Sequence, residues 1–194
     1  MKSSRRRLLT AAAGLVSAAL PIAVIARAER ASPAASRTMP LRGTPVLSDL
    51  DGRPVDLGRY LDHPLLLNFW ATWCAPCVAE MPALQALRDA SGPRGSAEIE
   101  VVAINAGQSI NQVEGFLKTL PLRLPIVMDP QKAALARWQV RVLPTTLLFD
   151  AAGLLRTTYV GARDWASAAV LEEVRATLLL RPSGRASSAS RADS

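Results

Sequence analysis

Cysteine and histidine are scarce in this chain. Its 194 residues include two cysteines, Cys74 and Cys77, and one histidine, His63. Two thiols exclude a small scaffold held together by many disulfides, and they exclude a zinc site made of four cysteines. Covalent haem attachment through Cys-x-x-Cys-His is excluded as well, because Val78 stands where the histidine would be. Thiol chemistry is therefore confined to four consecutive residues.

Charged residues are also few, and the excess of positive charge is not where nucleic-acid binding would need it. They make up 20% of the chain against 49% hydrophobic residues, which excludes disorder of the bulk and allows a packed core. The net charge of +7 comes from the two ends, because residues 29–180 hold 15 basic and 15 acidic side chains. A neutral body argues against nucleic acid as a partner, since binding a phosphate backbone requires clustered cations.

The first 28 residues are typical of an export segment. Arg5, Arg6 and Arg7 precede the uncharged residues 8–26, and a small-x-small pattern follows at 26–28. The uncharged stretch is nearly long enough to span a bilayer, but it is rich in alanine and contains a proline. We expect a cleaved signal peptide or a retained membrane anchor. Both alternatives place the body in the periplasm or an equivalent extracytoplasmic space, in the second case anchored to the membrane.

Two further segments flank a single predicted domain. Residues 29–40 and 181–194 are rich in Ala, Ser and Pro and poor in large apolar residues. The first is predicted to be a flexible linker and the second a disordered tail. The domain itself is expected to cover residues 41–180.

Within the domain, predicted strands and helices alternate. Apolar runs indicate strands at residues 65–70, 99–104, 126–128, 145–149 and 154–160. Apolar residues at helical spacing indicate helices from the cysteines to 89, at 110–120, from 130 to about 138, and from 164 or 165 to about 180. Parallel crossovers followed by a late hairpin predict an α/β fold with a mixed central β-sheet and helices on both faces.

Two helix details follow from the same patterns. Asp129 and Pro130 are predicted to supply the N-cap and the first residue of the third helix. The last helix is expected to turn one apolar side toward the core, formed by Trp165, Ala168, Leu171, Val174 and Leu178.

The two cysteines stand at the start of a helix that follows a buried strand. Unpaired N–H groups and the positive end of the helix dipole stabilise a thiolate at Cys74, so its pKa should lie below the ordinary value of about 8.5. Cys77 lies one turn later, close enough for a disulfide. A purely structural disulfide between the two cysteines is disfavoured, because closing a four-residue loop adds little to the stability of a fold. A Cu(I) site formed by both thiolates and Met81 stays open.

The body resembles the thioredoxin superfamily and looks most like its extracytoplasmic TlpA-like branch, which includes ResA- and DsbE-type proteins. The resemblance covers residues 41–178 and rests on Asn68-Phe69-Trp70-Ala71-Thr72-Trp73-Cys74-Ala75-Pro76-Cys77, Glu80-Met81-Pro82 and Val142-Leu143-Pro144-Thr145-Thr146. It implies a thioredoxin-like fold with an N-terminal β-hairpin at 45–60 and an extra helix-strand insertion at 110–128.

The resemblance also implies roles for the cysteines and for the residues that contact a substrate. Cys74 would be the attacking thiol and Cys77 the resolving thiol of a redox-active disulfide. Pro144 would be a cis-proline that, with Leu143, faces the disulfide and binds the substrate chain; the alternative is a trans proline at a strand entrance. Trp73 would shield the site on the substrate side, unless it is a core or rim aromatic.

Glu80 is the remaining site residue that the resemblance implies. Plain thioredoxins carry a buried aspartate where this chain has Asn68, which cannot take a proton from Cys77. Glu80 lies three residues after Cys77 and would serve as the proton acceptor instead. The alternative is a solvated helix residue that pairs with a nearby arginine.

The function implied is that of an exported thiol-disulfide oxidoreductase that acts mainly as a reductant, without a bound cofactor or metal. Its clients would be apocytochrome c or a copper-site assembly protein, both of which need reduced thiols before their cofactor is inserted. Because the compartment is oxidising, electrons would have to come from a membrane donor of the DsbD or CcdA type. A thiol oxidase and a Cu(I) carrier are the alternatives.

Overall fold

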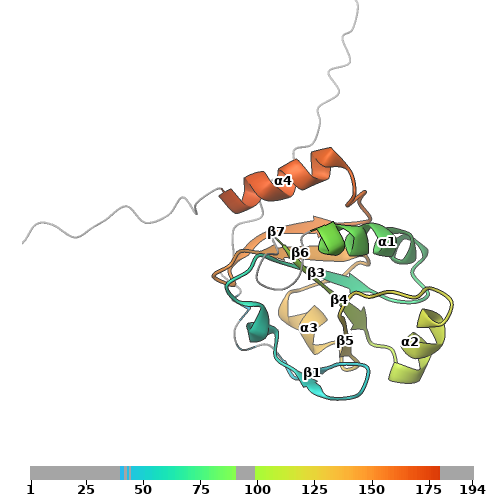
Figure 1. Cartoon of the computed structure of the whole chain (residues 1–194). Coiled ribbons are helices and arrows are strands. Elements are labelled where there is room, and N and C mark those ends of the chain that lie inside the picture. The colour runs from blue at the N-terminus through green and yellow to red at the C-terminus, as the bar shows by residue number, and fades with distance from the viewer. Residues whose placement is uncertain (1–39, 42, 44, 91–98, 180–194) are drawn as a thin grey trace, which may run out of the picture. The chain divides into compact units, whose positions relative to one another are not determined.

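The computed structural model describes residues 40, 41, 43, 45–90 and 99–179 (Figure 1). The predicted export segment and disordered tail lie outside these residues, as does the predicted linker except for its last residue. None of the helices in the described part of the chain is long and apolar enough to span a bilayer.

A seven-stranded mixed sheet forms the centre of the domain. The strands lie in the order β2-β1-β5-β4-β3-β6-β7 (Figure 1). Strand β3 pairs in parallel with β4 and antiparallel with β6, β4 pairs in parallel with β5, and the remaining pairs are antiparallel. The bounds are β1 Leu47–Ser48, β2 Pro54–Val55, β3 Leu65–Trp70, β4 Glu100–Ala106, β5 Ile126–Asp129, β6 Thr145–Phe149 and β7 Leu155–Val160. The predicted mixed sheet and the N-terminal hairpin, β1 with β2, are confirmed.

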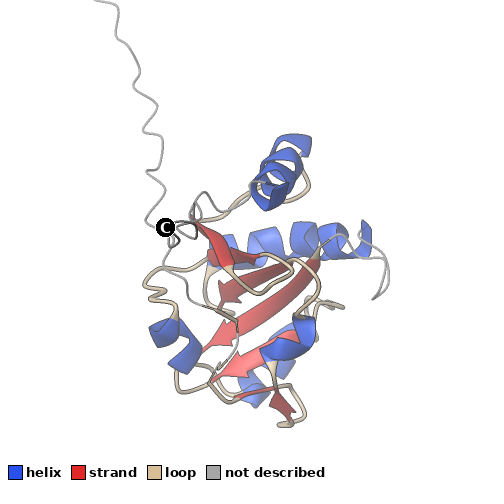
Figure 2. Cartoon of the chain, turned by 90° about the vertical axis from the view of Figure 1, so that its left-hand side faces the viewer, coloured by secondary structure: helices blue, strands red, loops and turns tan. Residues whose placement is uncertain are grey.

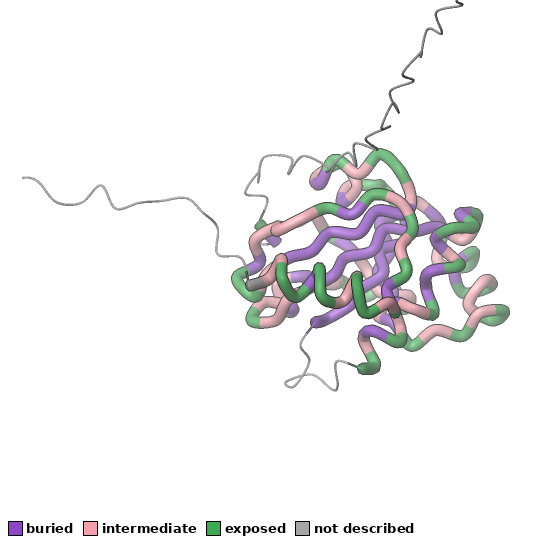
Figure 3. The backbone as a smooth tube through the Cα atoms, turned by 90° about the horizontal axis from the view of Figure 1, so that it is seen from above, coloured by how far each residue is buried: buried purple, intermediate pink, exposed green. Residues whose placement is uncertain are grey.

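Helices cover both faces of this sheet (Figure 2). The described helices are α1 Ala75–Ala90, α2 Ile110–Leu117, α3 Ala133–Arg137 and α4 Ala168–Leu179, with a 3₁₀ turn at Leu57–Tyr60. One core cluster joins Leu66 of β3 to buried residues of α1, α2 and α4, and a second joins Leu65, Leu67 and Phe69 to Ala134 of α3. Figure 3 shows buried strands at the centre of the domain. Strand β3 is buried along its whole length, because alternate residues enter the two cores.

The third helix starts later than predicted. Its N-cap is Lys132, with a left-handed φ of 58°, so Pro130 lies in the preceding turn and not at the first helical position. The Asp129 carboxylate still caps the helix from the end of β5, since it accepts hydrogen bonds from the backbone N–H groups of Ala133, Ala134 and Leu135 at 2.7–3.2 Å. The capping chemistry was predicted correctly, and the start of the helix was wrong.

The last helix is also shorter than predicted, because α4 begins at Ala168. Ala168 is exposed, so its assignment to the core side was wrong. Val174 is buried and Leu171 and Leu178 are partly buried against the core, as expected. Trp165 is fully buried, but it lies in the loop before the helix.

Strand ends from distant parts of the sequence meet at one edge of the sheet. The carboxyl ends of β3 and β4 are neighbours through the pair Trp70 and Asn105, and the start of β6 lies beside Phe69. The end of β7 lies beside Thr145. The loops at these ends carry Trp73, Cys74, Leu143 and Pro144, and α1, which holds Cys77 and Glu80, begins at the first of these loops. The topology therefore gathers the predicted site residues at a single edge.

Candidate active site

Cys74 and Cys77 form a disulfide at the amino-terminal end of α1. Helix α1 begins at Ala75, and the carbonyl of Cys74 accepts a hydrogen bond from Val78 N–H at 3.0 Å, so Cys74 occupies the N-cap position. Cys74 is 6% exposed, whereas Cys77 is fully buried. Cys74 therefore keeps a small exposed surface at this end of the helix, and Cys77 has none.

The position of Cys74 favours its ionised form once the disulfide is reduced. The free N–H groups of the first turn of α1 and the helix dipole both stabilise negative charge at that end. Pro76 lies in this first turn, where its missing N–H costs no intrahelical hydrogen bond. The arrangement suits a nucleophilic thiolate backed by a second, protected thiol.

A cis-proline loop lies at the same edge of the sheet. The peptide bond between Leu143 and Pro144 is cis, as the resemblance predicted, and the trans alternative is wrong. Pro144 is buried, and its carbonyl accepts a hydrogen bond from Gly161 N–H at 2.9 Å. Leu143 packs against the core cluster that contains both cysteines. The loop is thus fixed from both sides next to the start of β6.

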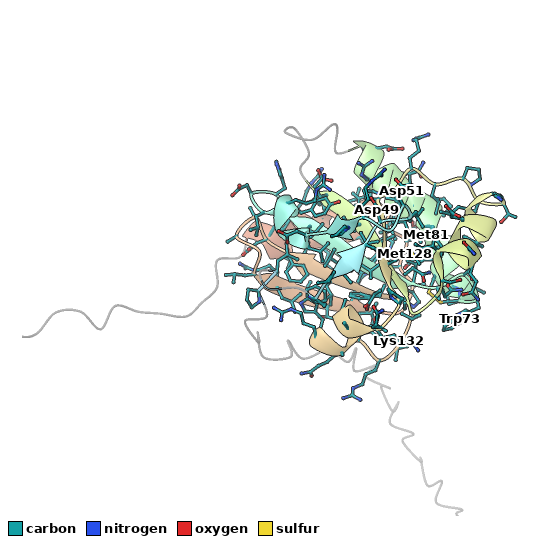
Figure 4. All side chains as sticks on the ribbon, turned by 90° about the horizontal axis from the view of Figure 1, so that it is seen from below. Asp49, Asp51, Trp73, Met81, Met128 and Lys132 are labelled. Atoms are coloured by element: carbon teal, nitrogen blue, oxygen red, sulfur yellow. A yellow bond between two sulfur atoms is a disulfide. The ribbon has the colours of Figure 1, made fainter. Side chains whose placement is uncertain are left out.

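Apolar side chains surround this edge. Among the residues that the structure describes, four large hydrophobic side chains are exposed, and three of them, Trp73, Val142 and Val160, belong to the loops and strand ends near Cys74. Trp73 is 70% exposed and projects from the fold (Figure 4), so the core alternative is wrong for it. Val142 and Val160 were not predicted as site residues, although Val142 begins the cis-proline motif and Val160 ends a predicted strand. We call these three residues the apolar rim.

Glu80 lies on the buried side of α1 and is not a solvated residue. It is 4% exposed, and its carboxylate accepts three hydrogen bonds: from Asn68 Nδ2 at 2.8 Å, from Arg163 backbone N–H at 3.1 Å and from Trp165 Nε1 at 3.0 Å. Burial raises the pKa of Glu80 above its ordinary value, and the three hydrogen bonds oppose this rise. The expectation that Glu80 could instead pair with an arginine in solvent is wrong, because its one contact with Arg163 is to the backbone.

Asn68 connects Glu80 to the centre of the sheet. It is fully buried on β3, and its Nδ2 also donates to Thr146 Oγ1 of β6 at 2.9 Å. Its Oδ1 is buried and has no hydrogen-bond partner within the described part of the protein. An amide can in principle present either its NH₂ group or its oxygen to a neighbouring carboxyl group.

A second polar cluster holds the turn that leads into Cys74. Gln108, in the loop after β4, accepts a hydrogen bond from Thr72 backbone N–H and donates to Thr72 Oγ1, both at 2.8 Å. Asn105 Nδ2 donates to the same Gln108 oxygen at 3.0 Å. Sequence reasoning missed Gln108, because only the folded sheet brings the loop after β4 beside the turn after β3.

Cys74, Cys77 and Met81, the ligands of the Cu(I) alternative, lie in one core cluster. Across residues 40, 41, 43, 45–90 and 99–179 there is no group of three or more His, Cys, Asp or Glu side chains that could hold a metal ion. His63 precedes β3 and Cys74 follows it, so the six residues of this strand separate them by about 20 Å. Met81 is fully buried in the core (Figure 4).

Known proteins resemble this chain in both sequence and fold. Residues 34–158, more than half of the chain, match the AhpC/TSA family. The thiol-disulfide oxidoreductase ResA of Geobacillus thermodenitrificans is 40% identical over 116 residues, which cover 60% of this chain and 65% of that protein. The match therefore spans slightly less than two thirds of this relative.

Two solved structures extend the comparison. A candidate thiol:disulfide interchange protein DsbE from Chlorobium tepidum has a TM-score of 0.58 and 28% identity, with 69% of this chain and 92% of that chain covered. StoA from Bacillus subtilis has a TM-score of 0.55 and 26% identity, with 67% and 94% covered. With the family match, the shared fold and the paired cysteines in hand, the chain belongs to the AhpC/TSA family as a thioredoxin-like protein of the ResA/DsbE type.

Proposed function

We propose that this protein is an extracytoplasmic thiol-disulfide oxidoreductase that reduces disulfides in client proteins. The observation that carries the proposal is the Cys74–Cys77 disulfide at the start of α1, where Cys74 keeps a small exposed surface and Cys77 has none. This asymmetry is what dithiol exchange requires, because one thiol must meet the client and the other must resolve the intermediate. The names of the ResA and DsbE relatives support the same activity.

The exchange proceeds in two steps that balance electrons and protons. The Cys74 thiolate attacks one sulfur of the client disulfide, forms a mixed disulfide and releases the other client sulfur, which takes up a proton. Cys77 then loses its proton and attacks Cys74 Sγ, which closes the Cys74–Cys77 bond and releases the second client thiol. Two electrons and two protons pass to the client, and the protein ends oxidised.

Glu80 is the group that we assign to the proton of Cys77. It lies three residues after Cys77 on α1 and is buried, so water does not compete for the transfer. Its raised pKa brings the carboxylate closer to the pKa of a thiol than an exposed glutamate would be. Glu80 therefore acts as a general base for the second step.

The apolar rim and the cis-proline loop form the client-binding surface in this proposal. An extended client segment beside Pro144 would cover Trp73, Val142 and Val160, which are 70%, 55% and 67% exposed without it. Removing such apolar surface from water favours formation of the complex. Leu143 supports this surface from the core side.

The expected extracytoplasmic location guides which electron donor and which clients we propose. A reductant outside the cytoplasm needs electrons delivered through the membrane, so we assign a donor of the DsbD or CcdA type. Apocytochrome c or a copper-site assembly protein would be the client, since each needs free thiols before its cofactor is inserted. Residues 1–28 would serve as the export signal or as the membrane anchor.

Variants of the two cysteines test the proposal. We expect Cys74→Ser to abolish reduction of insulin disulfides, because it removes the attacking sulfur. Cys77→Ser should instead accumulate a mixed disulfide with the client, detectable on a non-reducing gel and released by dithiothreitol. Expression of Cys77→Ser in the native host, followed by mass spectrometry of the trapped protein, identifies the client. Unchanged turnover in either variant would contradict the mechanism, and an inability of the parent protein to reduce insulin would indicate an oxidase.

A further inference from the structure

The loop between β7 and α4 supplies two of the three hydrogen-bond donors to Glu80. Arg163 backbone N–H and Trp165 Nε1 both donate to Glu80 Oε2, and Asn68 Nδ2 donates to Oε1. All three donors are neutral groups, so at these contacts the negative charge of Glu80 is stabilised by hydrogen bonds and not by a positive charge. Loss of any one of these hydrogen bonds should raise the affinity of the Glu80 carboxylate for a proton.

Trp165 holds its indole N–H in a fixed position. The residue is fully buried, and its ring meets that of Tyr159 edge to face, with centroids 5.4 Å apart and planes at 86°. The Arg163 guanidinium lies 4.6 Å from the centre of the Tyr159 ring on β7 and pairs with Glu173 of α4 at 2.5 Å. The indole therefore cannot turn away to find another acceptor, and water cannot replace Glu80 as its partner.

We propose that Trp165 is a positioning residue that sets the proton affinity of Glu80 through its indole N–H. The inference rests on the proposed role of Glu80 as the proton acceptor of Cys77, and it adds a residue outside the recognised site motifs. A hydrogen bond to the ionised form favours that form. Trp165 thus favours the ionised form of Glu80, which can accept a proton, whereas burial favours the protonated form.

The charged and titratable groups near Glu80 leave this interpretation intact. Cys77 is on the same helix and is the proposed proton donor. The guanidinium of Arg163 is directed to Tyr159 and Glu173, while only its backbone reaches Glu80. Tyr159 packs edge to face on the Trp165 ring, and burial raises the pKa of its hydroxyl above the ordinary value of 10.0, so it stays neutral at physiological pH. Asn68, from the sheet, carries no charge.

Trp165→Phe is the discriminating variant, because it keeps an aromatic ring against Tyr159 and removes the N–H. We expect the midpoint of the Glu80 carboxyl titration, followed by ¹³C NMR in the oxidised protein and assigned with Glu80→Gln, to rise by on the order of one pH unit. The acid limb of the insulin-reduction rate should move to higher pH by the same amount. Activity lost at neutral pH should therefore return under alkaline conditions.

Trp138→Phe is the matched control. Trp138 is also buried, lies edge to face on Phe69 and Phe149, and belongs to the core on the other face of the sheet. Its Nε1 has no hydrogen-bond partner within the described residues, so the same substitution removes no bond to a carboxylate. We expect a loss of stability similar to that of Trp165→Phe, with both the NMR midpoint and the acid limb unchanged.

The outcomes separate this inference from the proposed function. If Trp165→Phe leaves the NMR midpoint where it is, or moves it no more than Trp138→Phe does, the role of Trp165 is overturned whatever Glu80 does in catalysis. If Glu80→Gln leaves the acid limb intact, the proposed role of Glu80 fails, while the NMR midpoint still reports on Trp165. Should Trp165→Phe fold poorly, site-specific incorporation of 3-benzothienylalanine keeps the two-ring shape, removes the N–H and should give the same shift.

Discussion

Glu80 and Asp129 are two carboxylates that are alike in how deeply they are buried and in how many hydrogen bonds they accept. They are 4% and 1% exposed, each accepts three hydrogen bonds, and burial raises the pKa of both. Their donors differ in kind. Asp129 accepts only backbone N–H groups, which the start of α3 holds in place, whereas two of the donors to Glu80 are the side chains of Asn68 and Trp165.

This difference decides which carboxylate can take up a proton at low cost. A proton on either oxygen of Asp129 would face a backbone N–H group and break a hydrogen bond. A proton on Glu80 Oε1 would face Asn68, whose amide can turn and offer its unused Oδ1, while Oε2 keeps its two donors. Asp129 is therefore built as a helix cap, and Glu80 as a site that can change protonation state beside a thiol.

The largest expected effect is on catalysis at neutral pH. Glu80→Gln should lower kcat for insulin reduction by about 100-fold, since a general base contributes about 10²–10⁴ to the rate. Asp129→Asn should leave kcat per folded molecule within about twofold, because it removes a carboxylate that no thiol uses. Steady-state kinetics of both variants, corrected for the folded fraction by circular dichroism, makes the comparison. Equal losses in the two variants would show that burial of a carboxylate alone, and not its neighbours, matters.

A smaller effect, with the opposite ranking, is expected for the free energy of unfolding. Asp129→Asn places an NH₂ group against fixed backbone N–H donors and should cost about 2 kcal/mol. Glu80→Gln should cost less than about 1 kcal/mol, because the Asn68 amide can turn to accept from the new NH₂ group. Urea unfolding of the oxidised variants measures both values. A greater loss for Glu80→Gln would mean that Asn68 is not free to turn.

The sequence predicted those features of the fold and of the site that depend on local sequence pattern. The five main strands follow from apolar runs, and β6 begins and ends where predicted. The cysteine pair comes from a contiguous motif, whereas the cis-proline and the role proposed for Glu80 were implied by the resemblance to the thioredoxin superfamily. Asp129 was predicted as a cap from its place before Pro130, although the chain makes a further turn through Lys132 before α3 starts.

The rest depends on contacts that no local pattern encodes. Trp165 lies 85 residues after Glu80, and its sequence context shows only an aromatic residue near a helix start. The bond between Gln108 and Thr72 spans 36 residues and links the loops after two parallel strands. The burial of Glu80 could not be read from α1 either, because Trp165 and Arg163, which cover it, belong to the loop before α4.

The smallest expected effect is on the pH dependence of stability, where the two carboxylates should behave alike. Their pKa values are raised in the folded state, so the folded protein binds more protons than the unfolded chain above the ordinary values of 4.5 for Glu80 and 3.8 for Asp129. Stability should therefore fall as pH rises from these values through the raised pKa values. Glu80→Gln and Asp129→Asn should each flatten this fall, measured by urea unfolding of the disulfide-bonded protein from pH 4 to pH 8. A fall of undiminished steepness in both variants would contradict the raised pKa values, and flattening in only one would assign the shift to that carboxylate alone.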